Sequence, residues 1–139
     1  MTLVYPDTNV LIYLVENRMG LTAKIRLSLY PADGELPKLV FSELTRMECR
    51  VQPLRTGDFA VLDAYEQLFT NRAYRFASFD RPIFDLATQL RTDYGLKTPD
   101  ALHLAVAIGA GCTEFWTHDR RLAKAAQNRL KIVTFEGAP

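Results

Sequence analysis

Short β-rich segments alternate with helical segments along this sequence, and this alternation constrains the fold more than any other feature. The β-rich runs stand at residues 2–6, 38–41, 74–77, 114–117 and 131–135. Strands that are separated by helices join through right-handed crossovers into a parallel sheet, which helices cover on both faces. We therefore predict an α/β fold with a central parallel sheet of about five short strands, flanked by helices on both faces.

The helical segments occupy the intervals between these strands. They are predicted at residues 9–16, 21–30, 43–54, 58–69, 82–94, 99–110 and 120–130. The chain has 139 residues, of which 48% are hydrophobic, and this is enough for one compact core but too little for two. We expect one domain over residues 1–139.

Two carboxylates in the second half of the chain are predicted to meet at one edge of this sheet. Thr98 is a good N-cap, Pro99 suits the first helical position, and Asp100 then falls in the first turn of its helix. Asp119 follows the strand at 114–117 and precedes the next helical run. In a parallel sheet both positions lie at the carboxyl ends of the strands, where α/β folds place their sites.

Two more acids are expected at the same edge. Asp7 ends the first strand, and Glu48 lies on the helix predicted at 43–54. On a helical wheel the apolar residues of this helix form one stripe, made of Leu44, Met47, Val51 and Leu54. Glu48 lies at the border of that stripe, so its carboxylate is predicted to point partly inward.

Each of these acids has a structural explanation when it is taken alone. Asp7 and Asp119 suit N-caps, Asp100 complements a helix dipole, and Glu48 suits a solvated helix flank. Four carboxylates at one sheet edge, however, repel one another, and a divalent cation relieves that repulsion. A cluster of oxygen ligands without His or Cys favours magnesium or manganese over zinc.

Four motifs in this order resemble the PIN domain family, and the length is similar to that of its VapC ribonuclease toxins from prokaryotic toxin–antitoxin pairs. The motifs are VYPDTNVLIY (4–13), SELTRME (42–48), TPDALHLA (98–105) and THDRRL (117–122). The resemblance implies that Asp7, Glu48, Asp100 and Asp119 hold magnesium or manganese. It also implies that Thr8, Asn9 and Thr117 support them, while His118 stands where the family more often has Asn.

The same resemblance implies an activity and partners. The expected reaction is endonucleolytic hydrolysis of RNA phosphodiester bonds by a metal-activated water molecule, which leaves 5′-phosphate ends. Such a toxin inhibits translation until a cognate antitoxin protein neutralises it. Members of the family are usually homodimers, and we expect a homodimer or a larger toxin–antitoxin assembly.

The distribution of charge is compatible with an RNA substrate. The chain has 17 basic and 16 acidic side chains; without the four site acids, 17 basic residues face 12 acids, an excess of five positive charges. Candidate RNA contacts near the four acids are Arg46, Arg50, His118, Arg120 and Arg121. His103, three residues after Asp100, either packs in the core or reaches the site.

Cysteine usage and hydropathy bear on where the protein works. The two cysteines have no zinc or disulfide spacing, which favours a reduced cytoplasmic setting. No stretch of about 20 apolar residues occurs, so no membrane association is expected.

Three other functions fit parts of the sequence. A haloacid-dehalogenase-like phosphatase needs a DxD motif, but the first strand here is followed by Asp7, Thr8 and Asn9. A phosphorelay receiver domain needs an acidic pair there and an acceptor acid such as Asp80 after a central strand. A non-catalytic PIN-like module that binds RNA or protein remains an alternative.

Overall fold

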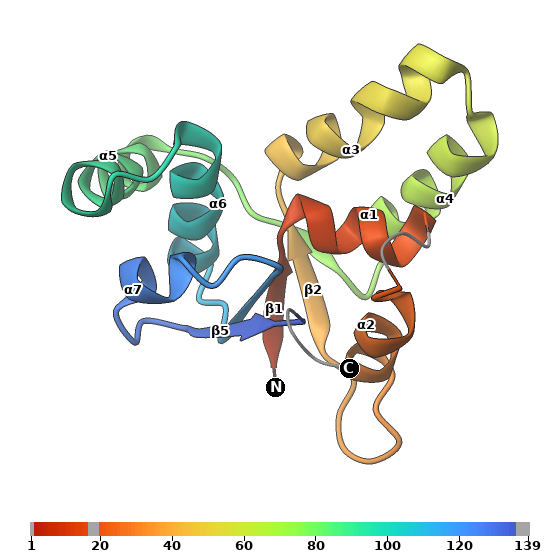
Figure 1. Ribbon diagram of the computed structural model, residues 1–139, viewed down its shortest axis with the longest axis horizontal. Coiled ribbons are helices and arrows are strands. Elements are labelled where there is room, and N and C mark those ends of the chain that lie inside the picture. The colour runs from red at the N-terminus through yellow and green to blue at the C-terminus, as the bar shows by residue number, and fades with distance from the viewer. Residues whose placement is uncertain (1, 17–19, 136–139) are drawn as a thin grey trace.

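The computed structural model describes residues 2–16 and 20–135, and it shows the predicted α/β architecture (Figure 1). The strands are β1 (Leu3–Pro6), β2 (Lys38–Phe41), β3 (Arg75–Phe76), β4 (Glu114–Thr117) and β5 (Lys131–Thr134). The helices are α1 (Thr8–Glu16), α2 (Thr22–Leu29), α3 (Glu43–Thr56), α4 (Phe59–Phe69), α5 (Arg81–Tyr94), α6 (Thr98–Gly109) and α7 (Leu122–Ala126). No helix in these described ranges is long and apolar enough to cross a lipid bilayer.

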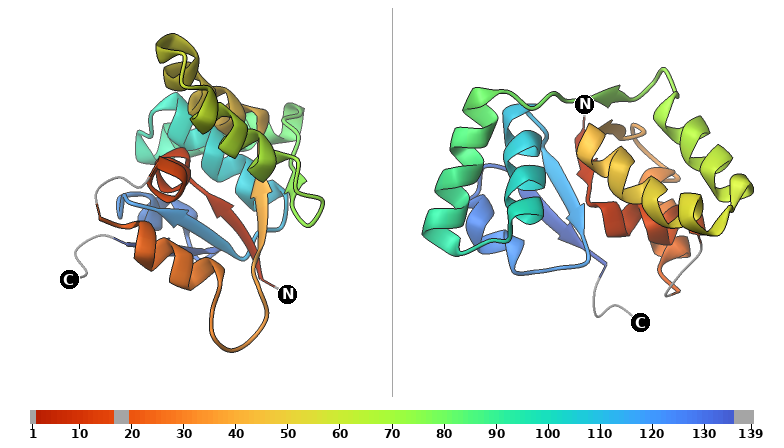
Figure 2. Two further views of the ribbon diagram at one scale, coloured as in Figure 1. Left: turned by 90° about the vertical axis from the view of Figure 1, so that its right-hand side faces the viewer. Right: turned by 90° about the horizontal axis from the view of Figure 1, so that it is seen from above.

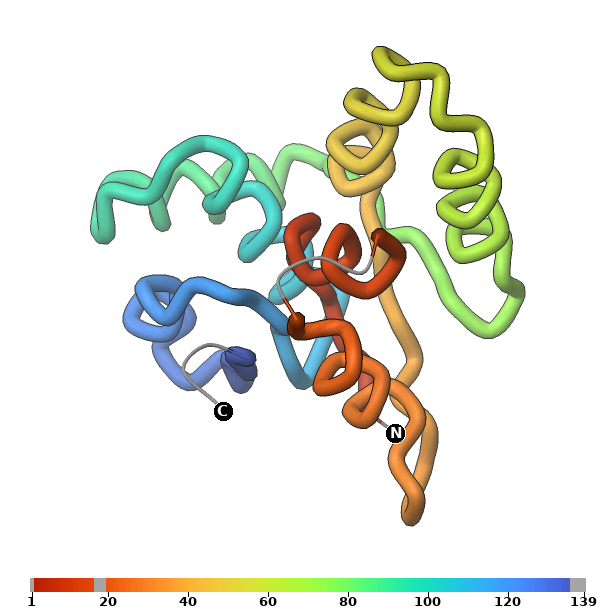
Figure 3. Tube along the Cα trace, turned by 45° about the vertical axis from the view of Figure 1, so that its right-hand side comes forward, coloured from red at the N-terminus to blue at the C-terminus, as the bar shows by residue number. Residues whose placement is uncertain are grey.

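All five strands of the described sheet run parallel, in the order β3-β2-β1-β4-β5. The chain builds outward from β1 through β2 to β3, and then builds in the opposite direction through β4 and β5. The strand order therefore reverses at β1, and the crevice outside the carboxyl ends of β1 and β4 is where folds of this class bind ligands. The loop between α2 and β2 lies near the amino ends of the strands, away from this crevice (Figure 3).

Successive side chains of each strand enter two different cores, because strand side chains alternate between the faces of a sheet. Tyr5 and Phe115 are paired in register and stack with ring centroids 5.5 Å apart, on the face that α5, α6 and α7 cover. Val4 and Trp116 belong to the core on the other face, beneath helices α1 to α4. Figure 2 shows these two groups of helices on either side of the sheet.

Helices α5 and α6 approach each other closely at Gly109. A Cβ atom at this position would collide with the side chain of Ile83 on α5. The missing side chain therefore lets α6 lie against α5, and α6 carries Asp100 at its first turn.

The predicted segments agree with the structure except at several ends. The bounds of β2 and β4 are as predicted, and helix α3 continues to Thr56, where Gly57 ends it with φ of 71°. The helix predicted at 120–130 is wrong in extent, because α7 has only five residues. Gln127 and Asn128 adopt the left-handed conformation after it, and this ends the helix before β5.

Candidate active site

Asp7 lies at the carboxyl end of the central strand, between two neighbouring segments. Its backbone N–H donates to the carbonyl of Trp116, 2.7 Å away, which ties the end of β1 to β4. The Asp7 carboxylate accepts the N–H of Thr8 at 2.8 Å and the hydroxyl of Thr117 at 3.1 Å. Burial raises the pKa of Asp7, and the charge of Asp100 adds to the rise although these hydrogen bonds oppose it. This anion therefore favours a nearby cation.

Glu48 points inward, as predicted, but not for the predicted reason. The apolar stripe expected to face the core is largely at the surface: Met47, Val51 and Leu54 are 56%, 41% and 55% exposed. The buried face of α3 is instead made of Thr45, Cys49 and Pro53. Glu48 is next to this face on the helix, and its carboxylate reaches α1 and α6.

Two hydrogen bonds hold the Glu48 carboxylate. Its Oε1 accepts from Thr8 Oγ1 at 2.6 Å and from His103 Nε2 at 2.7 Å. Partial burial by itself raises the pKa of Glu48, but the hydrogen bonds from His103 and Thr8 outweigh burial, so the pKa of Glu48 is lowered. Glu48 is therefore an anion that is already bonded on one oxygen.

Asp100 lies in the first turn of α6, as predicted, although the cap of this helix differs. Lys97, not Thr98, is the N-cap residue, and no side chain caps the first turn. Asp100 lines a cavity of about 280 Å³ that Asp7 and Glu48 also line. Three of the four predicted acids, from the β1–α1 junction, α3 and α6, therefore share one cavity.

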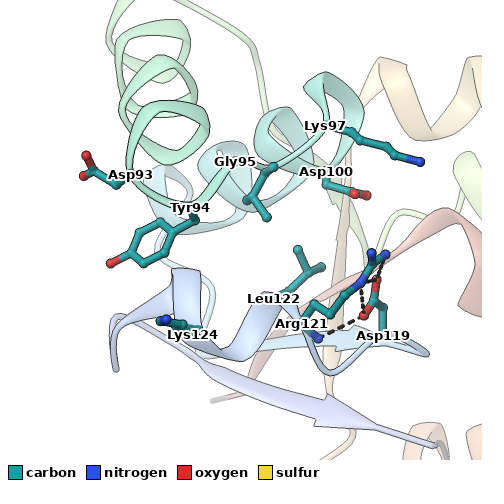
Figure 4. A pocket seen from close by; sticks show the side chains of 10 residues that line it. Asp93, Tyr94, Gly95, Lys97, Asp100, Asp119, Arg121, Leu122 and Lys124 are labelled. Atoms are coloured by element: carbon teal, nitrogen blue, oxygen red, sulfur yellow. Dashed lines mark hydrogen bonds and ion pairs between the residues drawn. The ribbon is translucent and has the colours of Figure 1, made fainter.

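Asp119 lines a different cavity, of about 310 Å³, which it shares with Asp100 (Figure 4). The side chain of Arg121 donates to the Asp119 carboxylate through Nε and Nη2, at 2.9 and 2.5 Å to Oδ2. The Arg121 guanidinium lowers the pKa of Asp119. The structural alternative for Asp119, a cap of the next helix, is not found, because Arg121 is the N-cap residue of α7.

The three predicted supporting residues have different surroundings. Thr8 is buried and bonds Glu48, whereas Asn9 is exposed and lines the cavity of Asp7, Glu48 and Asp100. Thr117 is fully buried and links two acids, since its hydroxyl donates to Asp7 and accepts the N–H of Asp119.

The donor chemistry of these cavities fits a magnesium or manganese ion. The acids supply oxygen ligands only, and the partly buried Asp7 carboxylate is an anion that a cation would stabilise. Within residues 2–16 and 20–135, no group of three or more His, Cys, Asp or Glu side chains is arranged to hold a metal ion. Magnesium retains several waters and takes one or two protein carboxylates, so three protein ligands are not required.

Of the five predicted RNA contacts, Arg121 lines the cavity of Asp100 and Asp119, and the other four line neither cavity. Arg46 forms an ion pair with Glu43 at 3.6 Å, and Arg50 follows one turn later, partly buried. Arg120 is exposed, whereas Arg121 is bonded to Asp119.

His118 packs edge-on against Tyr13, with ring centroids 5.5 Å apart. Its Nδ1 atom is buried and has no hydrogen-bond partner among the described residues.

His103 and Tyr5 are site neighbours that the sequence did not assign. His103 is 2% exposed, and it both packs in the core and reaches the site, where it bonds Glu48. Its Nδ1 lies 2.7 Å from Tyr5 Oη. The position of His103 one helical turn after Asp100 was the available signal, but its partner Tyr5 is 98 residues away in the chain.

A sequence model of the PIN domain matches residues 4–128. No curated protein matches the sequence significantly.

Several solved structures have a similar fold. VapBC2 from Rickettsia felis bound to a DNA fragment from its promoter is 11% identical, with a TM-score of 0.72 over 96% of this chain and 98% of that chain. A toxin–antitoxin complex from Klebsiella pneumoniae is 24% identical, with a TM-score of 0.68 over 97% and 98%. VapBC-1 from nontypeable Haemophilus influenzae is 19% identical, with a TM-score of 0.65 over 96% and 98%. At these identities the similarity is one of fold.

Proposed function

Because this chain belongs to the PIN domain family, we propose that it is a magnesium- or manganese-dependent endoribonuclease. It hydrolyses RNA phosphodiester bonds and leaves 5′-phosphate ends. We propose further that it is the toxin of a VapBC-type pair, which inhibits translation in the cytoplasm until its antitoxin neutralises it. Residues 1–139 act as a single domain in this proposal.

One observation carries the catalytic part of the proposal. Asp7, Glu48 and Asp100 come from three separate elements and line one cavity at the switch point of a parallel sheet. Burial of Asp7 beside Asp100 is unfavourable for two anions. A shared cation site explains this grouping of three acids more simply than a separate structural role for each acid does.

The residues of the chain have distinct tasks in this mechanism. Asp7, Glu48, Asp100 and Asp119 would hold the divalent cation, which when bound supplies Lewis-acid chemistry at phosphorus. Thr117 and Thr8 fix the carboxylates of Asp7 and Glu48 through hydrogen bonds. Arg121, which shares a cavity with Asp100 and Asp119, adds positive charge where an RNA phosphate would approach.

The toxin assignment and the partners rest on further support. The similar structures include toxin–antitoxin complexes of Klebsiella pneumoniae and other bacteria. Helix α3 exposes Met47, Val51 and Leu54, and Phe59 at the start of α4 is 75% exposed. Exposed apolar side chains that are grouped in this way are typical of protein–protein interfaces. They support a homodimer and an antitoxin partner.

A cleavage assay tests the catalytic proposal. The purified protein is incubated with structured RNA in magnesium or manganese, beside Asp7→Asn and Asp100→Asn variants. We expect both variants to lose roughly a hundredfold or more in rate, because each removes a carboxylate from the cation site. Asp85→Asn, an exposed change on α5, is the matched control and retains the rate. Cleavage by the two site variants at the parent rate would refute the mechanism.

Expression in bacteria separates the toxin from a non-catalytic binding module. Growth arrest should follow expression of the parent and disappear in the Asp7→Asn variant. Co-expression of a small protein encoded beside the gene should relieve the arrest. Arrest that persists in the variant would favour the binding module.

A further inference from the structure

A buried chain of hydrogen bonds connects the core of the protein to the candidate cation site through His103. The His103 ring is 2% exposed and comes from α6. Its Nε2 lies 2.7 Å from Oε1 of Glu48, and its Nδ1 lies 2.7 Å from Oη of Tyr5. Both ring nitrogens are therefore engaged, one toward the cavity and one toward the sheet.

The direction of these hydrogen bonds follows from the chemistry of the partners. The Glu48 carboxylate can only accept, so Nε2 of His103 carries a proton and donates. In the neutral ring, Nδ1 then accepts the hydroxyl proton of Tyr5. The Tyr5 oxygen can accept in turn from Ser42 at 2.7 Å and from Thr45 at 3.1 Å. Every donor in this hydrogen-bond network thus has an acceptor.

The far end of the network is rigid. Tyr5 and Ser42 are fully buried. Tyr5 lies in the carboxyl half of β1, and Ser42 is the N-cap residue of α3, directly after β2. The ring of Tyr5 is stacked on Phe115, so its hydroxyl has a fixed position. His103 is therefore anchored by the sheet itself and not only by its own helix.

The near end of the network is the Glu48 carboxylate, which is partly exposed. The Glu48 side chain is 28% exposed and lies on α3, which extends beyond the sheet (Figure 1). A free glutamate side chain loses conformational entropy when it is fixed in one conformation. Both hydrogen bonds that fix it end on Oε1, and Oε2 accepts none from the described residues.

We propose that His103 is a positioning residue for Glu48: it holds Oε1 of the carboxylate against the core and presents Oε2 to the divalent cation. This inference rests on the proposed function for the identity of the ligand. Tyr5 takes part by holding the imidazole from the opposite side. Partners that orient metal-binding carboxylates in this way typically change metal affinity 10- to 100-fold when they are replaced.

Binding of Mn²⁺ to the full-length protein, measured by calorimetry, tests this role with two substitutions of His103. His103→Gln keeps an amide donor near the position of Nε2, whereas His103→Asn keeps a polar atom near Nδ1 only. We expect His103→Asn to weaken Mn²⁺ binding by roughly 10- to 100-fold and His103→Gln to restore much of the loss. Equal Mn²⁺ affinity in the parent and in both folded variants would overturn the proposal, as would equal losses in both that follow their Tm.

Tyr5→Phe provides a second test that does not alter the imidazole. It removes only the hydroxyl and keeps the ring stacked on Phe115. Tyr65→Phe is the matched control, because Tyr65 is equally buried and its hydroxyl bonds Glu16 instead. We expect weaker Mn²⁺ binding in Tyr5→Phe than in Tyr65→Phe, and the reverse order would contradict the network. This comparison decides the matter if the His103 variants do not fold.

Metal-free crystal structures separate this inference from the proposed function. The Glu48 side chain should keep its conformation in His103→Gln and in Tyr65→Phe. It should adopt a different conformation in His103→Asn and in Tyr5→Phe. A parent that binds no Mn²⁺ contradicts the proposed function, and the Glu48 conformations then decide the role of His103 alone. An unchanged Glu48 in every variant would overturn that role.

Discussion

Arg121 holds Asp119 through three nitrogen atoms, two from its side chain and one from its backbone. Its Nε and Nη2 lie 2.9 and 2.5 Å from Oδ2 of Asp119, and its backbone N–H lies 2.9 Å from Oδ1. Asp119 thus has a cation of its own beside the cavity that it shares with Asp100. The other three acids share a separate cavity. The negative charge of Asp119 is therefore already balanced by Arg121, whereas the charges of Asp7 and Asp100 have no such arginine partner among the described residues.

Replacing Arg121 with Gln should raise the pKa of Asp119. The guanidinium hydrogen bond is the largest cause of the lowered value in the folded protein. A lowered carboxyl pKa stabilises the fold above the unfolded pKa, and this effect is lost as the pH falls through the folded pKa. The change in Tm should be small, because the pair is exposed. NMR titration of the Asp119 carboxyl carbon measures the shift, and Arg129→Gln controls for the lost charge; an unchanged pKa would contradict the pairing.

Replacing Asp7 with Asn should stabilise the metal-free protein while it greatly slows cleavage. Burial raises the pKa of Asp7, so the folded state binds the proton more tightly than the unfolded state does. The stability that this group contributes is present below the unfolded pKa and is lost as the pH rises through the folded pKa. At neutral pH the uncharged Asn avoids this loss, and each kcal/mol gained raises Tm by about 3 °C.

Thermal denaturation in EDTA at pH 7 and at pH 4 measures this effect. The difference in Tm between Asp7→Asn and the parent should shrink at the lower pH, and added magnesium should stabilise the parent more than the variant. A variant that is less stable than the parent at pH 7 would contradict the penalty assigned to Asp7.

Replacing Thr117 with Val should impair both stability and cleavage. The buried hydroxyl bonds the carboxylate of Asp7 and the N–H of Asp119, and an isosteric Val leaves both groups without this partner. Such a loss costs about 1–3 kcal/mol. Thr113→Val, just before β4, is the control, because its exposed hydroxyl bonds backbone groups of Leu3, at the end of the strands away from the site. Urea denaturation and the RNA assay should both distinguish the two; equal effects would contradict the role of Thr117.

Charged substitutions on α3 should break the proposed homodimer without unfolding the chain. Val51 and Leu54 are 41% and 55% exposed, so lysines there meet no core atoms. We expect the Val51→Lys/Leu54→Lys variant to sediment as a monomer with an almost unchanged Tm. Phe84→Lys, at an exposed position on α5, is the control. A dimer that persists in the double variant would place the interface elsewhere.

Local sequence patterns were sufficient for the strands. The run at 38–41 follows the turn-rich segment at 31–37 and the run at 114–117 follows Gly109 and Gly111, and their β-rich composition matches β2 and β4. Alternation with helices then determined the parallel sheet. It also determined that acids following the strands would gather at one edge, because every parallel strand ends there.

The orientation of α3 was not predictable from its own residues. The helical wheel placed Met47, Val51 and Leu54 inward, but α3 packs through the smaller Thr45 and Cys49. Periodicity identifies an apolar face without showing which surface covers it. The inward position of Glu48 was therefore a correct prediction that followed from a wrong packing face.

The sequence by itself determined the order of the elements and the choice of the four candidate carboxylates, because both depend on neighbouring residues in the chain. What only the tertiary structure decided is the partner of each carboxylate. Glu48 meets His103 across 55 residues, and His103 meets Tyr5 across 98. Hydrogen bonds act over about 3 Å, and only the packing of α3 and α6 on the sheet brings such distant side chains within that range.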